Sequence, residues 1–239
     1  MAARSATVAA SSSLLIWKRK NEQTFVATLI PAILTRDPEE VYEKLRFLDS
    51  IPEIRELHLD FADGKLVPNK TILPGDLKYL DTRLRIDAHL MVCNPHHYFH
   101  DLEALGVKTV VIHFESFQSV HDLAVAVENA AAMEFECSIA LNHHTDVSVL
   151  EQFKGKVKMA TMLCVDPGYQ GQPMLPDALD RIVEVRRRYP DMIIEADGGV
   201  RLENIESLVG HGADRIVVGS GIWHSAKPLE KIKSFLDKL

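Results

Sequence analysis

The chain has 239 residues, of which 46% are hydrophobic and 26% charged, and its formal net charge is -7. This composition is typical of a globular protein with one large core. The acidic balance and the lack of an apolar run near the roughly 20 residues of a membrane span predict no nucleic-acid and no membrane partner. Cys93, Cys137 and Cys164 form an odd, scattered set, which predicts buried thiols in a reducing compartment.

The first twenty residues differ in composition from the rest of the chain. They are rich in Ala and Ser, contain no acid, and end in a basic cluster, Trp17-Lys18-Arg19-Lys20. Because this cluster follows the short apolar patch instead of preceding it, a secretory signal is disfavoured, whereas an organellar transit peptide stays open. We expect an N-terminal extension over residues 1–22, disordered or targeting, a single catalytic domain over residues 23–239, and a cytoplasmic protein.

From Phe25 onward, apolar runs alternate with amphipathic segments. The predicted strands are 25–34, a run ending in His58 and Asp60, 84–92, 108–114, 137–142, 157–165, 192–197 and 215–219. The predicted helices are a segment opened by Asp37-Pro38, 74–80, a segment from Asn94-Pro95 to Gly106, 120–133, 146–153, 176–189, 202–210 and 228–239. Proline and acids in a first turn, as in Asp37-Pro38-Glu39-Glu40, are typical of helix starts.

Eight strands, each followed by a helix, predict parallel strands joined by crossovers. Several strands are nearly continuous apolar runs, as a sheet covered on both faces requires. A (β/α)₈ barrel and a doubly wound sheet both fit this alternation. The unusual polar residues and glycines follow several different strands, which is where a barrel collects its chemistry. The sequence therefore predicts an α/β protein, a single-domain (β/α)₈ TIM barrel.

Imidazoles and carboxylates lie at the carboxyl ends of three predicted strands. His58 and Asp60 share one face of a strand, because strand side chains alternate. If the strands carrying His89 and Asp197 turn the corresponding face inward, all four side chains converge at the barrel mouth. Two imidazoles and two carboxylates suit Zn²⁺, Fe²⁺ or Mn²⁺ better than Ca²⁺ or Mg²⁺. A layer of buried polar residues that satisfy one another is the alternative.

Glycines follow three successive predicted strands. They lie in Asp166-Pro167-Gly168-Tyr169-Gln170-Gly171-Gln172, in Gly198-Gly199, and in Gly219-Ser220-Gly221. Glycine allows backbone N–H groups to approach an anion closely, and a helix start adds partial positive charge. Because barrels commonly bind phosphate after strands seven and eight, the three loops predict a phosphate site.

With these motifs, the chain resembles the ribulose-phosphate 3-epimerase family from about residue 29 to its C-terminus. The motifs that carry the resemblance are His58-Leu59-Asp60 with Asp63-Gly64 and Val67-Pro68-Asn69, Asp87-x-His89-x-Met91-Val92, Asp166-Pro167-Gly168 with Gly171-Gln172, Asp197-Gly198-Gly199-Val200, and Gly219-Ser220. The resemblance implies a barrel that interconverts ribulose 5-phosphate and xylulose 5-phosphate in the pentose phosphate pathway. It also implies one divalent metal ion, Zn, Fe or Mn, and a small sugar phosphate as partner; a homo-oligomer stays open.

The resemblance assigns roles to particular residues. It implies that His58, Asp60, His89 and Asp197 hold the metal ion, and that Asp60 and Asp197 are also the catalytic acid/base groups. Inversion of carbon 3 needs two such groups, on opposite sides of a flat enediolate, and a metal ion would stabilise its charge. The residues implied to contact the substrate or its phosphate are His89, Met91, Gly168, Tyr169, Gln170, Gly171, Gly198, Gly199, Gly219 and Ser220.

The chain departs from the family pattern around the substrate. Ala32 replaces a serine, Ala62 and Leu163 replace two methionines, Gly168-Tyr169-Gln170-Gly171 replaces Gly-Phe-Gly-Gly, and His143-His144 replaces Pro-Gly. Smaller side chains at the reacting carbons would admit a larger sugar. A 3-epimerase of a ketohexose phosphate such as allulose 6-phosphate is therefore one alternative. A catalytically degenerate barrel that only binds sugar phosphates is another, which the intact pair of carboxylates disfavours.

The remaining polar candidates are expected to have no catalytic role. His143 and His144 are predicted to lie in a loop at the mouth, although a metal or substrate contact stays open. The group His96, His97 and His100 is predicted to lie on the surface. Cys164 is predicted to be a packed thiol instead of a redox-sensitive one.

Overall fold

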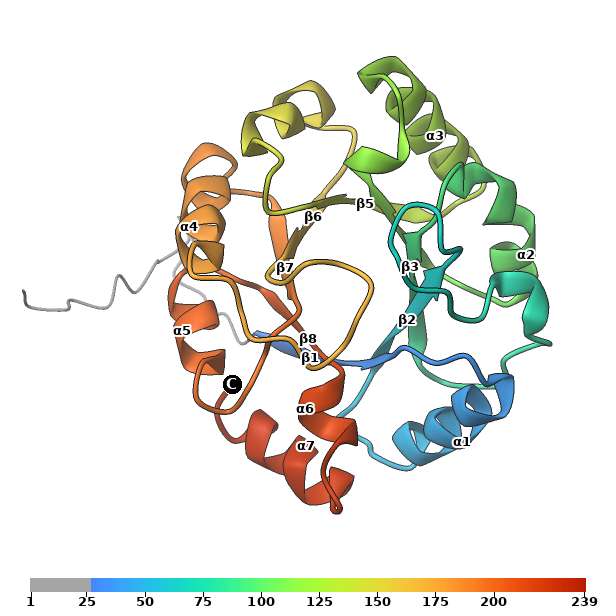
Figure 1. The fold of residues 1–239 in the computed structure, drawn as a ribbon, viewed down its shortest axis with the longest axis vertical. Helices are drawn as coiled ribbons and strands as arrows, with labels where there is room; N and C mark the ends of the chain where they lie inside the picture. Colours follow the sequence, from blue (N-terminus) through green and yellow to red (C-terminus); the bar gives the residue numbers. More distant parts are fainter. Residues whose placement is uncertain (1–26) are drawn as a thin grey trace, which may run out of the picture.

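The computed structural model describes residues 27–239, which form a closed barrel of eight parallel strands (Figure 1). The strands are β1 (Thr28–Ile33), β2 (Glu56–Ala62), β3 (Arg85–Met91), β4 (Thr109–His113), β5 (Glu136–Leu141), β6 (Met159–Leu163), β7 (Ile193–Asp197) and β8 (Arg215–Val218). Each strand pairs with the next in the chain, and β8 pairs with β1 to close the ring. The predicted barrel is confirmed, and the doubly wound sheet is excluded. The predicted extension over residues 1–22 lies outside the described residues.

Helices surround the barrel, as Figure 1 shows. They are α1 (Pro38–Asp49), α2 (Phe99–Ala104), α3 (Val120–Ala132), α4 (Ala178–Arg188), α5 (Ile205–Gly210), α6 (Ser220–Trp223) and α7 (Pro228–Leu236), with 3₁₀ turns η1 (Pro74–Asp76), η2 (Pro95–Tyr98), η3 (Phe114–Ser116) and η4 (Val147–Phe153). The start of α1 is as predicted, because the Asp37 carboxylate accepts the backbone N–H of Glu39 at 3.0 Å. No helix within residues 27–239 is long and apolar enough to cross a membrane.

The segment 146–153 is helical as predicted, but its helix is a 3₁₀ helix, η4. Its buried residues, Val147, Leu150 and Phe153, recur every third position. A 3₁₀ helix has three residues per turn, so these side chains fall in line on one face. Packing against the barrel therefore selects the tighter helix.

Two other predicted helices are shorter than expected. The segment 74–80 is helical only over η1, where the Asp76 carboxylate accepts the backbone N–H of Leu73 at 2.8 Å. The helix predicted after Asn94 is divided into η2 and α2, and Asn94 itself has a left-handed backbone, with φ of 54°. The ends of the other elements differ from the predicted ranges by a few residues, as is usual for fraying ends.

Apolar side chains fill the space between the strands and the helices, whereas much of the barrel interior is polar. Leu57, Leu59 and Phe61 of β2 point outward and are fully buried under the helices. The alternating residues His58 and Asp60 point inward. The interior thus carries ionisable groups that need partners, because an unpaired buried charge is costly.

The floor of the barrel is an ion network centred on Arg215, the first residue of β8. Its guanidinium contacts the carboxylates of Glu56 at 2.5 Å, Glu195 at 2.9 Å, and Asp87. Burial alone would lower the pKa of Arg215, and these three carboxylates raise it above its ordinary value. The network keeps a charged layer beneath the mouth of the barrel, and His58 lies directly above it, with Nδ1 3.8 Å from Glu195 Oε1.

Candidate active site

The four residues proposed as metal ligands meet at the carboxyl ends of β2, β3 and β7. Their ligand atoms all lie within 4.8 Å of one another. Nδ1 of His89 is 2.8 Å from Asp60 Oδ1 and 3.4 Å from Asp197 Oδ2. Nε2 of His58 is 3.5 Å from the same Asp60 oxygen and 3.8 Å from Asp197 Oδ2. The structure therefore brings together residues from three separate strands, as the strand alternation predicts.

The hydrogen bonding of His58 is incomplete. Its side chain is fully buried, and neither ring nitrogen has a hydrogen-bond partner among the described residues. The surrounding carboxylate oxygens lie at 3.5 Å or more, beyond good hydrogen-bond length. A buried imidazole without partners is costly. A cation among two imidazoles and two carboxylates would remove that cost, so the residues present fit a divalent ion such as Zn²⁺, Fe²⁺ or Mn²⁺.

The two carboxylates of this set differ in their electrostatic environment. Burial raises the pKa of Asp60, but His58 and His89 outweigh it and lower the value to about 2. Burial raises the pKa of Asp197 to about 6, with the nearby Asp60 charge adding to the shift and the two imidazoles opposing it. Burial lowers the pKa of His58, yet Asp60, Glu195 and Asp197 together raise it to about 10. The cluster thus favours positive charge at its centre.

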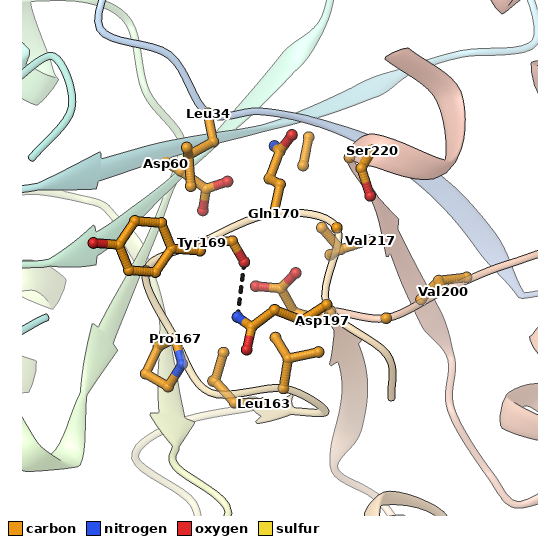
Figure 2. Close-up of a pocket in the computed structure, with 18 of the residues that line it drawn as sticks. Leu34, Asp60, Leu163, Pro167, Tyr169, Gln170, Asp197, Val200, Val217 and Ser220 are labelled. Atoms are coloured by element: carbon orange, nitrogen blue, oxygen red, sulfur yellow. Dashed lines mark hydrogen bonds between the residues drawn. The ribbon is translucent and has the colours of Figure 1, made fainter. Parts of the chain in front are cut away.

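A pocket joins this cluster to the glycine loops (Figure 2). At one end it is lined by Asp60, His89 and Asp197, and Figure 2 shows both carboxylates pointing into it. The other predicted site residues on its wall are Met91, Gly168, Tyr169, Gln170, Gly171, Gly198, Gly199, Gly219 and Ser220. His58 lies beneath the wall, so it can touch a metal ion without touching the substrate.

The end of the pocket that the sequence predicts to bind phosphate, called the phosphate end below, is built from backbone that requires glycine. Gly199 has φ of +68°, and a Cβ there would lie 2.6 Å from the backbone of Met174. A Cβ on Gly219 would lie 2.7 Å from Nε2 of Gln170, so the Gln170 amide covers this loop. Ser220 opens α6 directly after β8. Backbone N–H groups at such glycines are accessible to a small anion.

The loop after β6 crosses the mouth of the barrel and is tied to the loop after β2 (Figure 1). The hydroxyl of Tyr169 donates to the carbonyl of Pro68 at 2.6 Å, and the Asn69 amide donates to the carbonyl of Gly168 at 2.6 Å. Two motifs that are about 100 residues apart in the sequence are thereby joined over the pocket.

Two residues of this region were not identified as site residues from the sequence. His113, the last residue of β4, has Nε2 2.8 Å from Nε2 of His89. Arg201 lines the phosphate end and donates to Ser220 Oγ at 3.2 Å. The sequence offered one indication for each residue. His113 lies near the end of a predicted strand, and Arg201 lies two residues after Gly199. Neither signal was distinctive, because histidine and arginine are common at strand ends and in loops.

Several sequence candidates lie away from the metal set. His143 lies in the loop after β5, with Nδ1 3.3 Å from Oδ1 of Asp166 in the loop after β6, and its ring packs on His144. The group His96, His97 and His100 is exposed. Ala62 packs against Val67 and Met91 behind the pocket, so its replacement of a methionine alters the wall indirectly.

The prediction of three buried thiols is wrong for two of them. Cys164 is fully buried, and burial raises its pKa to about 12. Cys93 and Cys137 are half-buried. Cys93 lies two residues after the end of β3, and Cys137 is the second residue of β5. The expectation of a packed thiol at position 164 is confirmed.

This combination defines a class: a (β/α)₈ barrel whose His/Asp cluster adjoins glycine loops suited to phosphate. A sequence model described as the ribulose-phosphate 3 epimerase family matches residues 28–223. The chain is 32% identical over 181 residues to the ribulose-phosphate 3-epimerase of Schizosaccharomyces pombe, covering 74% of this chain and 78% of that protein. It is 33% identical to the enzyme of the same name from Escherichia coli K12, covering 77% and 84%. The chain belongs to the ribulose-phosphate 3-epimerase family.

Solved structures with similar backbones support the fold alone. A 3-hexulose-6-phosphate synthase from Salmonella typhimurium superposes with a TM-score of 0.62 at 13% identity, covering 89% of this chain and 98% of that one. A tryptophan synthase α-subunit from Pyrococcus furiosus superposes with a TM-score of 0.61 at 18% identity, covering 90% and 97%. Barrels of this kind host many reactions, so function depends on the site.

Proposed function

We propose that this protein is a ribulose-phosphate 3-epimerase that interconverts D-ribulose 5-phosphate and D-xylulose 5-phosphate. The observation that carries the proposal is that Asp60 and Asp197 point into one pocket, which glycine loops suited to phosphate complete. Inversion of carbon 3 removes a proton beside the ketone and returns a proton to the opposite face. Two carboxylates from different strands supply one acid/base group for each face, giving a two-base reaction through an enediolate.

His58, Asp60, His89 and Asp197 would hold one divalent metal ion, Zn²⁺, Fe²⁺ or Mn²⁺. A bound ion supplies positive charge beside the substrate oxygens on which negative charge develops. His58, which is fully buried beneath the pocket wall, would serve the ion alone. Asp60 and Asp197 also line the pocket, so they would both hold the ion and move the proton at carbon 3.

The phosphate would bind at the far end of the pocket, on backbone N–H groups of Gly198, Gly199, Gly219 and Ser220. We add Arg201 to this set. Its guanidinium already hydrogen bonds to Ser220, and no carboxylate within residues 27–239 pairs with it. A guanidinium beside a dianion forms charge-assisted hydrogen bonds, which are stronger than neutral ones. Binding energy at the phosphate then orients the reacting carbon.

The other proposed substrate contacts line the pocket between its two ends and over its mouth. Met91 lies beside His89 at the reacting end, and the loop from Gly168 to Gly171 covers the mouth through Tyr169 and Gln170. These contacts would exclude water from the reacting carbon. Ala32 and Leu163 also line the wall, and they are smaller or less flexible than the family's serine and methionine.

The pentulose phosphate is favoured over the ketohexose phosphate and over a degenerate binding barrel. The relatives from S. pombe, Aquifex aeolicus and E. coli all carry the name ribulose-phosphate 3-epimerase. Ala62 does not line the pocket, so the wall differs from the family pattern at fewer positions than the sequence suggests. Both carboxylates needed for turnover are present.

The test is an epimerase assay of the full chain after loading with Zn²⁺, Fe²⁺ or Mn²⁺. We expect formation of D-xylulose 5-phosphate from D-ribulose 5-phosphate, and exchange of the carbon-3 hydrogen with deuterium from the solvent. Removal of the metal with a chelator should abolish both, and re-addition should restore both. Turnover of allulose 6-phosphate without turnover of ribulose 5-phosphate would instead identify a hexulose epimerase. No exchange with either sugar would identify a binding barrel.

The setting of the enzyme is proposed from the same family relation. The proposed reaction would place the protein in the pentose phosphate pathway. A cytoplasmic location is supported by a 31% identical rice relative named as a cytoplasmic isoform. Organellar targeting by residues 1–20 and assembly into a homo-oligomer stay predictions, as does the domain boundary near residue 23.

A further inference from the structure

The two ring nitrogens of His89 face different partners. Nδ1 faces the metal set, 2.8 Å from Asp60 Oδ1 and 3.4 Å from Asp197 Oδ2. Nε2 points the opposite way, 2.8 Å from Nε2 of His113 on the neighbouring strand β4. A neutral imidazole has one N–H and one bare nitrogen, so the partner of Nε2 decides which nitrogen is bare.

The contact between the two imidazoles is directional. Their ring planes are inclined by only 10°, and the ring centroids are 5.0 Å apart. Both side chains are about 1% exposed, so water does not compete for the contact. An N–H bond and a nitrogen lone pair both lie in the ring plane, so nearly parallel rings can align one with the other. One nitrogen must donate and the other must accept.

The second nitrogen of His113 leads to a carboxylate. Nδ1 of His113 is 3.4 Å from Oε2 of Glu115. This oxygen is buried and has no hydrogen-bond partner among the described residues, which leaves it open to an N–H donor. The other oxygen of Glu115 is fixed, because it accepts the backbone N–H of Asn142 at 2.9 Å and the hydroxyl of Thr145.

While no cation is bound, Nδ1 of His89 can donate a hydrogen to Asp60 Oδ1, 2.8 Å away, but it must be bare to bind a metal ion. With Nδ1 bare, only one arrangement of protons satisfies the rest of this chain. The carboxylate of Glu115 can only accept, so His113 carries its proton on Nδ1 and has a bare Nε2. That bare nitrogen accepts the Nε2–H of His89. Nδ1 of His89 is then bare and faces the metal set. We propose that His113 and Glu115 are positioning residues that fix the metal-binding tautomer of His89, resting on the metal role proposed for His89 above.

Such outer partners orient ligand imidazoles and raise their basicity. At His58 the nearest group to Nδ1 on that side is the Glu195 carboxylate, and at 3.8 Å it is too far to form a hydrogen bond. His89 instead reaches a carboxylate through a second imidazole. The series of contacts from His89 through His113 to Glu115 connects β3 to β4 and to the loop after β5. It therefore links the proposed metal ligand His89 to another loop at the barrel mouth.

The experiment compares metal binding by four forms of the full chain. Apo protein is titrated with Zn²⁺ in competition with a chromogenic chelator. In His113→Phe the ring remains but the acceptor is lost, and we expect the Kd for Zn²⁺ to rise roughly 10- to 100-fold. In His113→Gln the side-chain oxygen can accept near the place of Nε2, and we expect a Kd within about threefold of wild type. His121→Phe, an exposed site on α3, is the matched control and should leave the Kd unchanged.

A second measurement separates positioning from structural damage. Thermal unfolding of the apo forms should be similar, and turnover of His113→Phe should recover when Zn²⁺ is in large excess. If His113→Phe does not fold, Glu115→Gln tests the same chain, and its Kd should rise several-fold because an amide oxygen is a weaker acceptor than a carboxylate.

The outcomes are distinct. Wild-type affinity in His113→Phe, or equal losses in the Phe and Gln variants, would overturn the positioning role while leaving the proposed function intact. If His113→Phe does not fold, wild-type affinity in Glu115→Gln would do the same. The same titration is repeated on the wild-type chain with Fe²⁺ and Mn²⁺, and a chain that binds none of Zn²⁺, Fe²⁺ and Mn²⁺ would overturn the metal assignment itself.

Discussion

The two ends of the pocket are built by different means. The end proposed to bind the metal ion, called the metal end here, consists of side chains on β2, β3 and β7, and its imidazoles are almost completely buried. The phosphate end consists of loop backbone at glycines after β6, β7 and β8, together with Arg201. Strand side chains are held by the barrel on both sides, whereas the loops depend on a few hydrogen bonds such as that from Tyr169 to Pro68.

The difference matches what each end must do. Proton transfer at one carbon requires groups held to a fraction of an ångström, which rigid strands provide. A phosphate is symmetrical and strongly charged, so backbone N–H groups and one guanidinium recognise it without such precision. Changes at the metal end should therefore reduce turnover, and changes at the phosphate end should chiefly reduce affinity.

The largest effect is expected at the metal end. Asp197→Asn removes a proposed acid/base group without changing side-chain volume, and we expect kcat to fall roughly 10²- to 10⁴-fold. Asp191→Asn, an exposed site just before β7, is the matched control. Circular dichroism should show that both variants are folded. Turnover near the wild-type rate in Asp197→Asn would contradict the two-base assignment.

The corresponding change at the phosphate end is Arg201→Met. Loss of one charge-assisted hydrogen bond costs about 1.5–3 kcal/mol, so KM should rise roughly 10- to 100-fold while kcat changes much less. Arg187→Met removes the same charge from an exposed position on α4 and serves as the control. Steady-state kinetics with ribulose 5-phosphate separates the two constants. A fall in kcat with KM unchanged would contradict the assignment of substrate affinity to the phosphate end and of turnover to the metal end.

Glycine at the phosphate end can be tested through stability. Gly199→Ala places a Cβ 2.6 Å from the Met174 backbone and at φ of +68°, so both overpacking and backbone strain apply. Gly106→Ala has a similar φ of +79° but open space around the Cβ. We expect a loss of about 1–2 kcal/mol in the free energy of unfolding for Gly106→Ala and about 1–3 kcal/mol more for Gly199→Ala. If urea denaturation gave equal losses in the free energy of unfolding for both variants, the loop at Gly199 would be able to move and make room for the Cβ without cost.

The smallest effect is expected on the pocket wall. Ala32→Ser restores the hydroxyl that the family pattern places on β1, at a buried position that lines the pocket. One neutral hydrogen bond contributes about 0.5–1.5 kcal/mol, so KM for ribulose 5-phosphate should fall roughly 2- to 10-fold. A higher KM in this variant would indicate that the pocket has adapted to a substrate without that contact.

Much of the fold and part of the site followed from local rules. Alternating apolar runs and amphipathic segments predict the barrel, and period-two alternation places His58 and Asp60 on one inward face. The 3₁₀ form of η4 did not follow, because burial of Val147, Leu150 and Phe153 depends on the surface beneath them. Helix type in such short segments is decided by packing and not by propensity.

The sequence by itself determined the order of strands and helices, the residue types at each strand end, and the glycines that a close backbone approach requires. Only the tertiary structure decided which of these residues meet. His113 and His89 are 24 positions apart in the chain and 2.8 Å apart in the barrel, and Arg201 reaches Ser220 in the same way. The physical reason is that strand alternation is local, whereas contacts between neighbouring strands depend on the register and closure of the whole ring.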